Sequence, residues 1–240
     1  MKYESMIKGV FVERPNRFIA RVLIDGEEAL AHVKNTGRCK ELLISGATIY
    51  LEDHCSRMGA RKLRYSLIAV EKDELLINMD SQAPNEIVAE ALSLDTLILP
   101  GMTPPIRFRR EQTYGDSRLD FYLEDSLGRI GYMEVKGVTL ELDRICRFPD
   151  APTERGRKHL VTLEKAVSEG YVGYVLFVLQ MRGIISFRPN DEMDPAFGKA
   201  LRNAASAGVV VLAYDCDVTQ STLAMHRPIN VELTENLETE

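Results

Sequence analysis

The sequence has no excess of positive charge. Its 240 residues carry a formal net charge of -6 at pH 7, whereas nucleic-acid-binding proteins usually have a basic surface or at least a concentrated basic stripe. The overall charge therefore gives no electrostatic sign of a nucleic-acid binder. Binding of that kind would have to come from local clusters of lysine and arginine.

Cysteine and histidine are scarce and scattered. The chain has four of each, and neither the cysteines nor the histidines are clustered among themselves: Cys39, Cys55, Cys146, Cys216, His32, His54, His159 and His226. No Cys-x-x-Cys pair occurs, and the close Cys/His spacing that structural zinc requires is missing. We therefore predict reduced, mostly buried thiols and no zinc site.

Long uninterrupted apolar runs are also missing. Crossing a bilayer takes roughly 18 apolar residues or more, and no segment approaches that length. The first residues lack the sustained apolar core of a secretory signal. We expect a cytoplasmic protein with no membrane partner, and the sequence leaves its oligomeric state open. With 45% hydrophobic residues, the chain can build a proper core in one or two domains.

Short apolar segments with polar connections fill the first 80 residues. They are residues 9–12, 18–24, 28–32, 47–52, 63–70 and 75–78. Several short strands with hardly any helical period predict a small closed barrel or sandwich. About five strands in this length suit an OB-type barrel, a fold that often holds oligonucleotides or oligosaccharides. The fold by itself identifies no ligand.

Three basic clusters accompany these segments. They are Arg14, Arg17 and Arg21; Lys34, Arg38 and Lys40; and Arg57, Arg61, Lys62 and Arg64. The clusters either converge on one groove or scatter evenly over the surface. Arg17 and Arg38 are our candidates for contacts with DNA.

The pattern changes near residue 80, where we place a boundary between domains 1–80 and 81–240, the second ending in an acidic tail. Pro84-Asn85 is a helix-start signal before the helical residues 86–92. Further helices are expected at 153–170 and 194–207, and strands buried on both faces at 171–179 and 209–214. With a hairpin after the first helix, this order gives an α/β (α+β) mixed sheet flanked by helices. That is the layout of restriction-endonuclease-like proteins.

The hairpin carries the most informative residues. Residues 119–123 and 130–138 flank a turn and predict two antiparallel strands. A turn centred on Leu127 pairs residues whose numbers add up to 254, so Asp120 should lie opposite Glu134, with Lys136 on the same face. Two carboxylates so placed could share a divalent cation, and without one they would repel and one pKa would rise. The alternative is a structural salt bridge with Lys136.

Asp120 and Glu134-Val135-Lys136 resemble the metal-binding acids and catalytic lysine of the PD-(D/E)xK nuclease superfamily. Residues 114–121, 134–140 and 148–160 are similar to the sugar fermentation stimulation protein A (SfsA) family. Residues 32–38 resemble its His-x-x-Asn-Thr-Gly segment, although a lysine stands where proline is usual. The resemblance runs to about residue 233. It implies an N-terminal OB-like domain joined to a nuclease-like domain, described in the family as non-specific DNA binding with a suggested role in regulating sugar metabolism.

The expected site holds Mg²⁺ or Mn²⁺, hard cations that take oxygen ligands. Asp120 and Glu134 are the main ligands, with the Val135 carbonyl and Glu90 as further candidates. Lys136 would position the attacking water or contact a phosphate oxygen, and we favour electrostatic stabilisation because a lysine beside two carboxylates stays protonated. The other interpretation of Glu90 is a solvated charge on a helix face.

A polar helix face is the second expected contact surface. It contains Arg155, Lys158, His159 and Thr162, opposite the apolar residues of the same helix. Such a face could contact DNA phosphates, which brings affinity without sequence information; the alternative is a solvated face. Arg118 lies on the same side of its strand as Asp120 and could orient an acid or anchor a phosphate.

Three hypotheses follow. The first is a non-specific DNA-binding protein with a divalent-metal-dependent nuclease site, acting on DNA or RNA. The second is a catalytically weak or inactive DNA-binding regulator of sugar metabolism. The third is an interaction protein whose hairpin carboxylates form only a salt-bridge network. No recognition helix of the helix-turn-helix kind is evident, so operator-specific control finds no support.

Overall fold

The computed structural model describes residues 1–35 and 37–234. Thr36 of the Asn-Thr-Gly segment and the end of the expected acidic tail lie outside the described residues.

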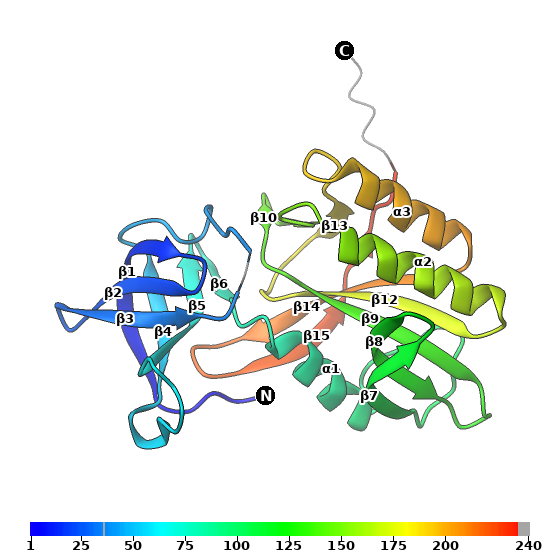
Figure 1. Ribbon diagram of the computed structural model, residues 1–240, viewed down its shortest axis with the longest axis horizontal. Helices are drawn as coiled ribbons and strands as arrows, with labels where there is room; N and C mark the ends of the chain where they lie inside the picture. Colours follow the sequence, from blue (N-terminus) through cyan, green and yellow to red (C-terminus); the bar gives the residue numbers. More distant parts are fainter. Residues whose placement is uncertain (36, 235–240) are drawn as a thin grey trace, which may run out of the picture.

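An N-terminal β-barrel lies beside a larger sheet with helices (Figure 1). The predicted boundary near residue 80 falls in the short link between a strand that ends at Asn78 and a helix that begins at Ala83. No helix in the described ranges is both long and apolar enough to span a bilayer.

The N-terminal barrel confirms the expected OB-type fold. Its strands are β1 (Met6–Asn16), β2 (Ile19–Ile24), β3 (Glu27–Val33), β4 (Thr48–Asp53), β5 (Tyr65–Lys72) and β6 (Leu75–Asn78). They follow the order β3-β2-β1-β4-β5-β6, and a parallel pairing of β3 with β5 closes the barrel. Alternating residues such as Ala20, Val22, Ala31 and Val33 are fully buried, as the two-residue period of a strand requires.

The second domain is built on a mixed sheet, also as expected. Its strands are β7 (Arg107–Tyr114), β8 (Ser117–Glu124), β9 (Ile130–Val138), β12 (Val172–Leu179), β14 (Val210–Val218) and β15 (Leu223–Pro228), in the order β15-β14-β12-β9-β8-β7. The central strands β9, β12 and β14 are parallel. Helix α1 (Ala83–Ser93) lies on one face, and α2 (Glu154–Ser168) and α3 (Pro195–Ser206) lie on the other (Figure 1).

Local capping explains where the helices start and stop. The Thr153 side chain accepts a hydrogen bond from Gly156 N at 3.0 Å, and α2 ends just before Gly170, whose φ is +92°. Asp194 caps α3 in the same way by accepting from Phe197 N at 2.9 Å. Caps of this kind satisfy backbone N–H groups that have no partner inside the helix, and glycine tolerates the left-handed conformation that follows a helix.

Several short elements were not predicted. A small second sheet contains β10 (Glu141–Leu142), β11 (Ile145–Phe148), β13 (Ser186–Pro189) and β16 (Asn230–Val231), and a 3₁₀ turn, η1 (Cys55–Arg57), follows β4. Strands of two to four residues are too short to show a hydrophobic period. The edge strand β7 was not predicted either, and most of its residues are exposed.

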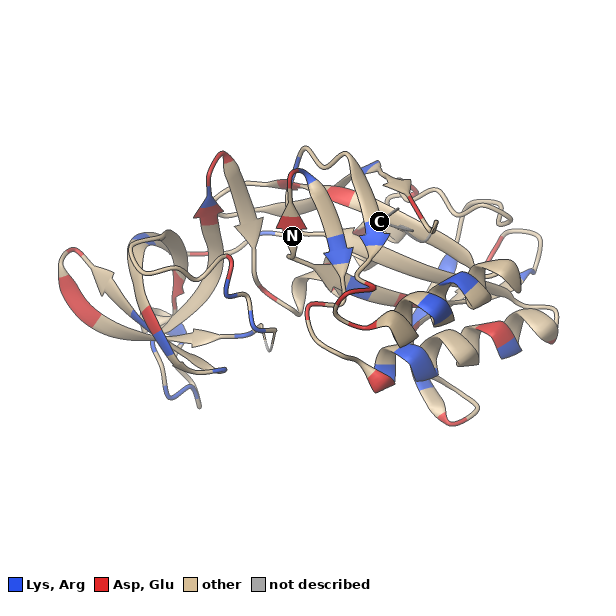
Figure 2. Cartoon of the chain, turned by 90° about the horizontal axis from the view of Figure 1, so that it is seen from above, with Lys and Arg blue, Asp and Glu red and all other residues tan. Residues whose placement is uncertain are grey.

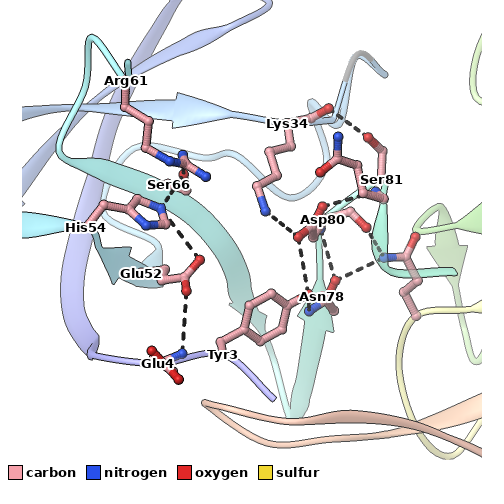
Figure 3. A network of polar contacts seen from close by, with 12 residues as sticks. Tyr3, Glu4, Lys34, Glu52, His54, Arg61, Ser66, Asn78, Asp80 and Ser81 are labelled. Carbon is pink, nitrogen blue, oxygen red and sulfur yellow. Dashed lines mark hydrogen bonds and ion pairs between the residues drawn. The ribbon is translucent and has the colours of Figure 1, made fainter. Parts of the chain in front are cut away.

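The two domains share a hydrophobic cluster and a polar junction. Ile77 and Met79 of the barrel belong to the same buried cluster as Cys146 and Met181 of the second domain. At the junction, the Gln180 side chain donates to Asn78 Oδ1 at 3.0 Å and to the Asp80 carbonyl at 3.1 Å. Figure 3 shows Asp80 and Asn78 at the centre of this network. The barrel is therefore docked on the second domain by directional contacts as well as by apolar packing.

The cysteines give a first testable prediction. Cys39, Cys146 and Cys216 are buried, and Cys55 is exposed; burial raises the pKa of the Cys39 thiol to about 12. Because the thiolate is the reactive species, we expect one fast-reacting thiol in the native protein, measured with a chromogenic disulfide reagent. A Cys55→Ser variant should lose that phase, and fast reaction of a second thiol in that variant would contradict the assignment.

Candidate functional site

The strands β8 and β9 separate where the candidate site begins. The predicted register is confirmed, since Phe121 pairs with Met133 and Tyr122 with Tyr132, but the ladder between the two strands ends at Phe121. Asp120 and Glu134 are therefore not a ladder pair, contrary to the expectation. Instead, Asp120 Oδ2 accepts a hydrogen bond from Val135 N at 2.7 Å. A carboxylate thus satisfies a main-chain donor that the neighbouring strand leaves free.

Asp120 is held from the α1 side of the sheet. Its Oδ1 accepts a hydrogen bond from the Asn85 side chain, in the first turn of α1, at 2.9 Å. Burial, and then the charge of the neighbouring Glu134, raise the pKa of the Asp120 carboxyl above its ordinary value. The two hydrogen bonds thus fix the position of the Asp120 carboxylate, but they do not fully offset the cost of burying its negative charge beside Glu134.

Glu134 is held from the opposite side. Only 3% of the residue is exposed, and its Oε1 accepts from Lys136 Nζ at 2.5 Å and pairs with His159 Nδ1 from α2. Burial alone would raise the pKa of Glu134, but His159 and Lys136 outweigh it and lower that pKa. The second oxygen, Oε2, is buried without a hydrogen-bond partner among the described residues.

His159 does not belong to the exposed helix face that we predicted. The buried face of α2 contains Gly156, His159, Leu160, Leu163 and Ala166, a spacing that places His159 at the edge of the apolar stripe. Its ring consequently points to the sheet, where it meets Glu134. The prediction that His159 lies on an exposed helix face is therefore wrong, and the residue lies beside the carboxylates.

Of the remaining residues of that helix face and of β8, Lys158, Thr162 and Arg118 have local partners. Lys158 Nζ donates to the Asp116 carbonyl at 3.0 Å, in the turn between β7 and β8. Thr162 Oγ1 lies 2.8 Å from Ser117 Oγ. Arg155 is exposed. Arg118 is also exposed, and its Nε lies 2.8 Å from Glu111 Oε2, so it points away from the carboxylates toward the edge strand.

Glu90 has another contact than the one predicted, and Val135 meets Asp120 through its N–H. The Glu90 carboxylate pairs with the amino group of Met1 at 2.6 Å, so the structure does not bring it to Asp120 and Glu134. Val135 contributes its N–H to Asp120, and its side chain is buried in the core on the α1 side. The α1 residue that reaches the site is Asn85, which we had noted only as part of a helix-start signal.

The candidate DNA contacts of the barrel lie at its surface. The Arg17 guanidinium lies over the Phe18 ring, 4.8 Å from its centroid. Arg38 is exposed, and its N–H donates to Asp150 Oδ2 at 3.1 Å, which ties its loop to the second domain. Lysine and arginine are interleaved with acidic residues over both domains (Figure 2). Any nucleic-acid contact is therefore local.

Comparison with known proteins covers nearly the whole chain. A model described as "SfsA N-terminal OB domain" matches residues 12–79, and one described as "Sugar fermentation stimulation protein RE domain" matches residues 82–222. A sugar fermentation stimulation protein homolog of Alkaliphilus oremlandii is 48% identical over 97% of this chain and 99% of its own length. A homolog from Clostridium botulinum is 46% identical over 96% of this chain and 98% of its own. The solved structure of Pyrococcus furiosus SfsA in complex with Ca²⁺ has a TM-score of 0.85 at 26% identity, covering 97% of this chain and 98% of that one.

Proposed function

We propose that this chain, which belongs to the sugar fermentation stimulation protein (SfsA) family, is a divalent-metal-dependent nuclease that binds DNA without sequence specificity. Asp120 and Glu134 would hold the cation, and Lys136 would act on the scissile phosphate or on the attacking water. The family and the nuclease-like fold support the class of reaction, and the site chemistry supports the assignment of residues.

One observation carries the proposal. Glu134 Oε2 is buried and has no hydrogen-bond partner in the part of the chain that the structure describes, and a buried polar atom left unpaired costs about 1–3 kcal/mol. A cation placed there would also offset the burial and the Glu134 charge that together raise the pKa of Asp120. The donor set fits, because Mg²⁺ commonly takes one or two carboxylates and keeps several waters. That the Pyrococcus furiosus relative is solved in complex with Ca²⁺, another cation that prefers oxygen ligands, supports the choice.

Several groups of the chain would each have a separate role around such a cation. The bound metal would supply acidified water and charge stabilisation. Asn85 and Val135 N–H fix the orientation of Asp120. Lys136, whose side chain is 16% exposed and lies against Glu134, would place a fixed positive charge near a phosphate oxygen. His159 holds Glu134 from the helix side, so the carboxylate keeps one orientation.

A second function is favoured by a different feature of the same site. Lys136 and His159 already pair with Glu134, so the carboxylate has a lysine ammonium and an imidazole beside it without any metal. A DNA-binding regulator that has lost cleavage, or retains little of it, would keep this arrangement as a structural network. In such a protein the exposed basic residues would matter more for function than the acids.

Cleavage assays separate the two functions. We expect the full-length protein to nick supercoiled plasmid or degrade single-stranded DNA with Mg²⁺ or Mn²⁺ and to be inactive in EDTA. A Lys136→Met variant should be slower by about 100-fold or more, because it loses a charge that stabilises the transition state. Lys165→Met, on the exposed face of α2, is the matched control and should retain activity. Binding without cleavage under all these conditions would favour the regulator.

A further inference from the structure

A small cavity lies where the barrel meets the second domain. Its volume is about 200 Å³, which is below the roughly 300–1,000 Å³ of sites that hold drug-sized molecules. The barrel contributes Asn35 and Gly37 to its lining, and the second domain contributes residues such as Thr139, Arg147 and Asp150. A molecule held in this cavity would therefore be small, and it would contact both domains.

Two glycines of the lining allow polar side chains to come close. A Cβ atom on Gly37 would overlap with Asp150 Oδ2, and one on Gly137 would lie only 2.6 Å from Gln180 Oε1. Any other residue at these positions would push the barrel loop or the end of β9 away from the polar groups. The two backbone segments therefore approach the cavity closely because they carry no side chain there.

The lining contains hydrogen-bond donors that the protein itself does not fully use. Arg147 Nε is buried and has no partner among the described residues, and leaving a buried donor unpaired is costly. Thr139 is 7% exposed, and its hydroxyl makes a weak contact of 4.0 Å with Cys39 Sγ. A ligand that accepts hydrogen bonds would satisfy both groups.

Hydrogen-bond acceptors line the same cavity. The Gln180 amide nitrogen is engaged at the domain junction, where it donates two hydrogen bonds, so its Oε1 faces the other way, toward Gly137. The Asp150 carboxylate accepts a hydrogen bond from Arg38 N at 3.1 Å through Oδ2, and a carboxylate can accept more than one. Donors and acceptors thus lie around one small space.

The charges around the cavity favour a neutral ligand. Arg147 and Asp150 are the two charged residues of its lining, so their charges cancel. Arg147 Nη1 lies 3.4 Å from Glu192 Oε1, so the guanidinium charge has a partner although its Nε does not. Burial, and to a lesser extent the charge of Asp150, raise the pKa of the nearby Glu41 carboxyl. An anionic ligand would add to this repulsion.

Apolar side chains complete the lining. They belong to Val138, Leu140 and Phe148, and they can pack against C–H groups. A hydroxyl group donates one hydrogen bond and accepts two, so a molecule with several hydroxyls on a carbon ring suits both the donors and the acceptors. Its C–H groups would lie against the apolar side chains.

We propose that this junction cavity binds a small neutral molecule with several hydroxyl groups, of the size of a monosaccharide or a cyclic polyol. Such a ligand would join the barrel loop at Asn35 to the end of β9 and would stabilise the docked arrangement of the two domains. Asp120, Glu134 and Lys136 lie outside the lining, so this binding does not depend on the proposed nuclease function.

The test uses the full-length protein in EDTA with three neutral probes, D-glucose, D-ribose and myo-inositol, and with a dianion, succinate, and a zwitterion, glutamine. Saturation-transfer NMR measures binding, and hydrogen exchange of the wild-type protein locates it. The variants Thr139→Val and Arg147→Met remove a hydroxyl and a guanidinium from the lining. Their matched controls are Thr113→Val and Arg107→Met, at exposed positions of β7. Circular dichroism checks the fold of all four variants.

We expect at least one neutral probe to bind and to slow hydrogen exchange in residues 37–40 and 137–150. Its affinity should be at least about tenfold weaker in both lining variants, because each loses a hydrogen bond to the ligand, and unchanged in the controls. Failure of all three neutral probes to bind would overturn the proposal. Slowed exchange elsewhere, or equal affinity in lining and control variants, would also overturn it. Tighter binding of succinate or glutamine would reject the neutral class of ligand.

Discussion

Replacing Glu134 by glutamine should abolish metal-dependent cleavage, with the rate falling by at least about 100-fold. Glutamine keeps the shape and still accepts a hydrogen bond from Lys136 or His159, so the fold should survive. It removes the negative charge that a cation needs. It also removes the carboxylate oxygen that has no hydrogen-bond partner among the described residues. Metal-free binding of DNA should be unchanged or stronger, because one acid near the phosphate is lost. Initial cleavage rates and anisotropy on the same preparations provide the measurement.

Glu90→Gln is the control for this experiment, because its carboxylate pairs with the Met1 amino group rather than with the site. It should cleave at the wild-type rate, which would also decide against Glu90 as a metal ligand. Undiminished cleavage by Glu134→Gln would remove the metal site from the proposal. A loss of DNA binding in a correctly folded Glu134→Gln protein would contradict the electrostatic argument.

Replacing Asp80 by alanine should destabilise the protein by about 3–5 kcal/mol, as removing one partner of a buried ion pair does. Asp80 is 2% exposed, and its Oδ2 lies 2.5 Å from Lys34 Nζ. Its other oxygen, Oδ1, accepts from Gln82 N at the start of α1. The alanine variant would leave the Lys34 charge, only 14% exposed, without its partner. The free energy of unfolding from urea titration is the quantity to measure.

Glu74→Ala is the comparison for Asp80→Ala. The Glu74 side chain is 90% exposed, and its contact with Arg144 is 3.5 Å long, so we expect a change of no more than about 0.5 kcal/mol. If Asp80→Ala also lost less than about 1 kcal/mol, the Lys34–Asp80 pair would not be a principal contact between the domains.

Much of the fold could be predicted because local patterns determine it. The strands of the barrel were visible as short apolar segments, and β12 and β14 as apolar runs, since burial on both faces removes polar residues from a strand. The turn at Leu127 fixed the register of β8 and β9 correctly. Strands such as β10 and β16 could not be predicted, because two residues carry no period and their pairing depends on distant partners.

The candidate acids could be named from the sequence, but the contacts that hold them could not. Asp120, Glu134 and Lys136 follow from strand alternation and from the family resemblance. The contact of Asn85 with Asp120 joins residues 35 positions apart, and no sequence period reports it. His159 was misplaced because it lies between a polar and an apolar stripe, and a small rotation of the helix decides which side it faces. The separation of β8 from β9 at Asp120 is likewise a tertiary effect.

The separation of β8 from β9 at Asp120 gives this residue a structural role. Asp120 satisfies the Val135 N–H and anchors α1 through Asn85, so its carboxylate contributes to the architecture of the sheet whether or not the protein cleaves anything. A descendant that abandoned catalysis would still be under pressure to keep this aspartate. Among the described residues, Glu134 makes no comparable contact with the main chain. Its Oε1 contacts only the side chains of Lys136 and His159, and its Oε2 has no hydrogen-bond partner. Replacement of the aspartate would therefore disturb the sheet and α1 directly, whereas replacement of the glutamate would remove contacts with side chains alone.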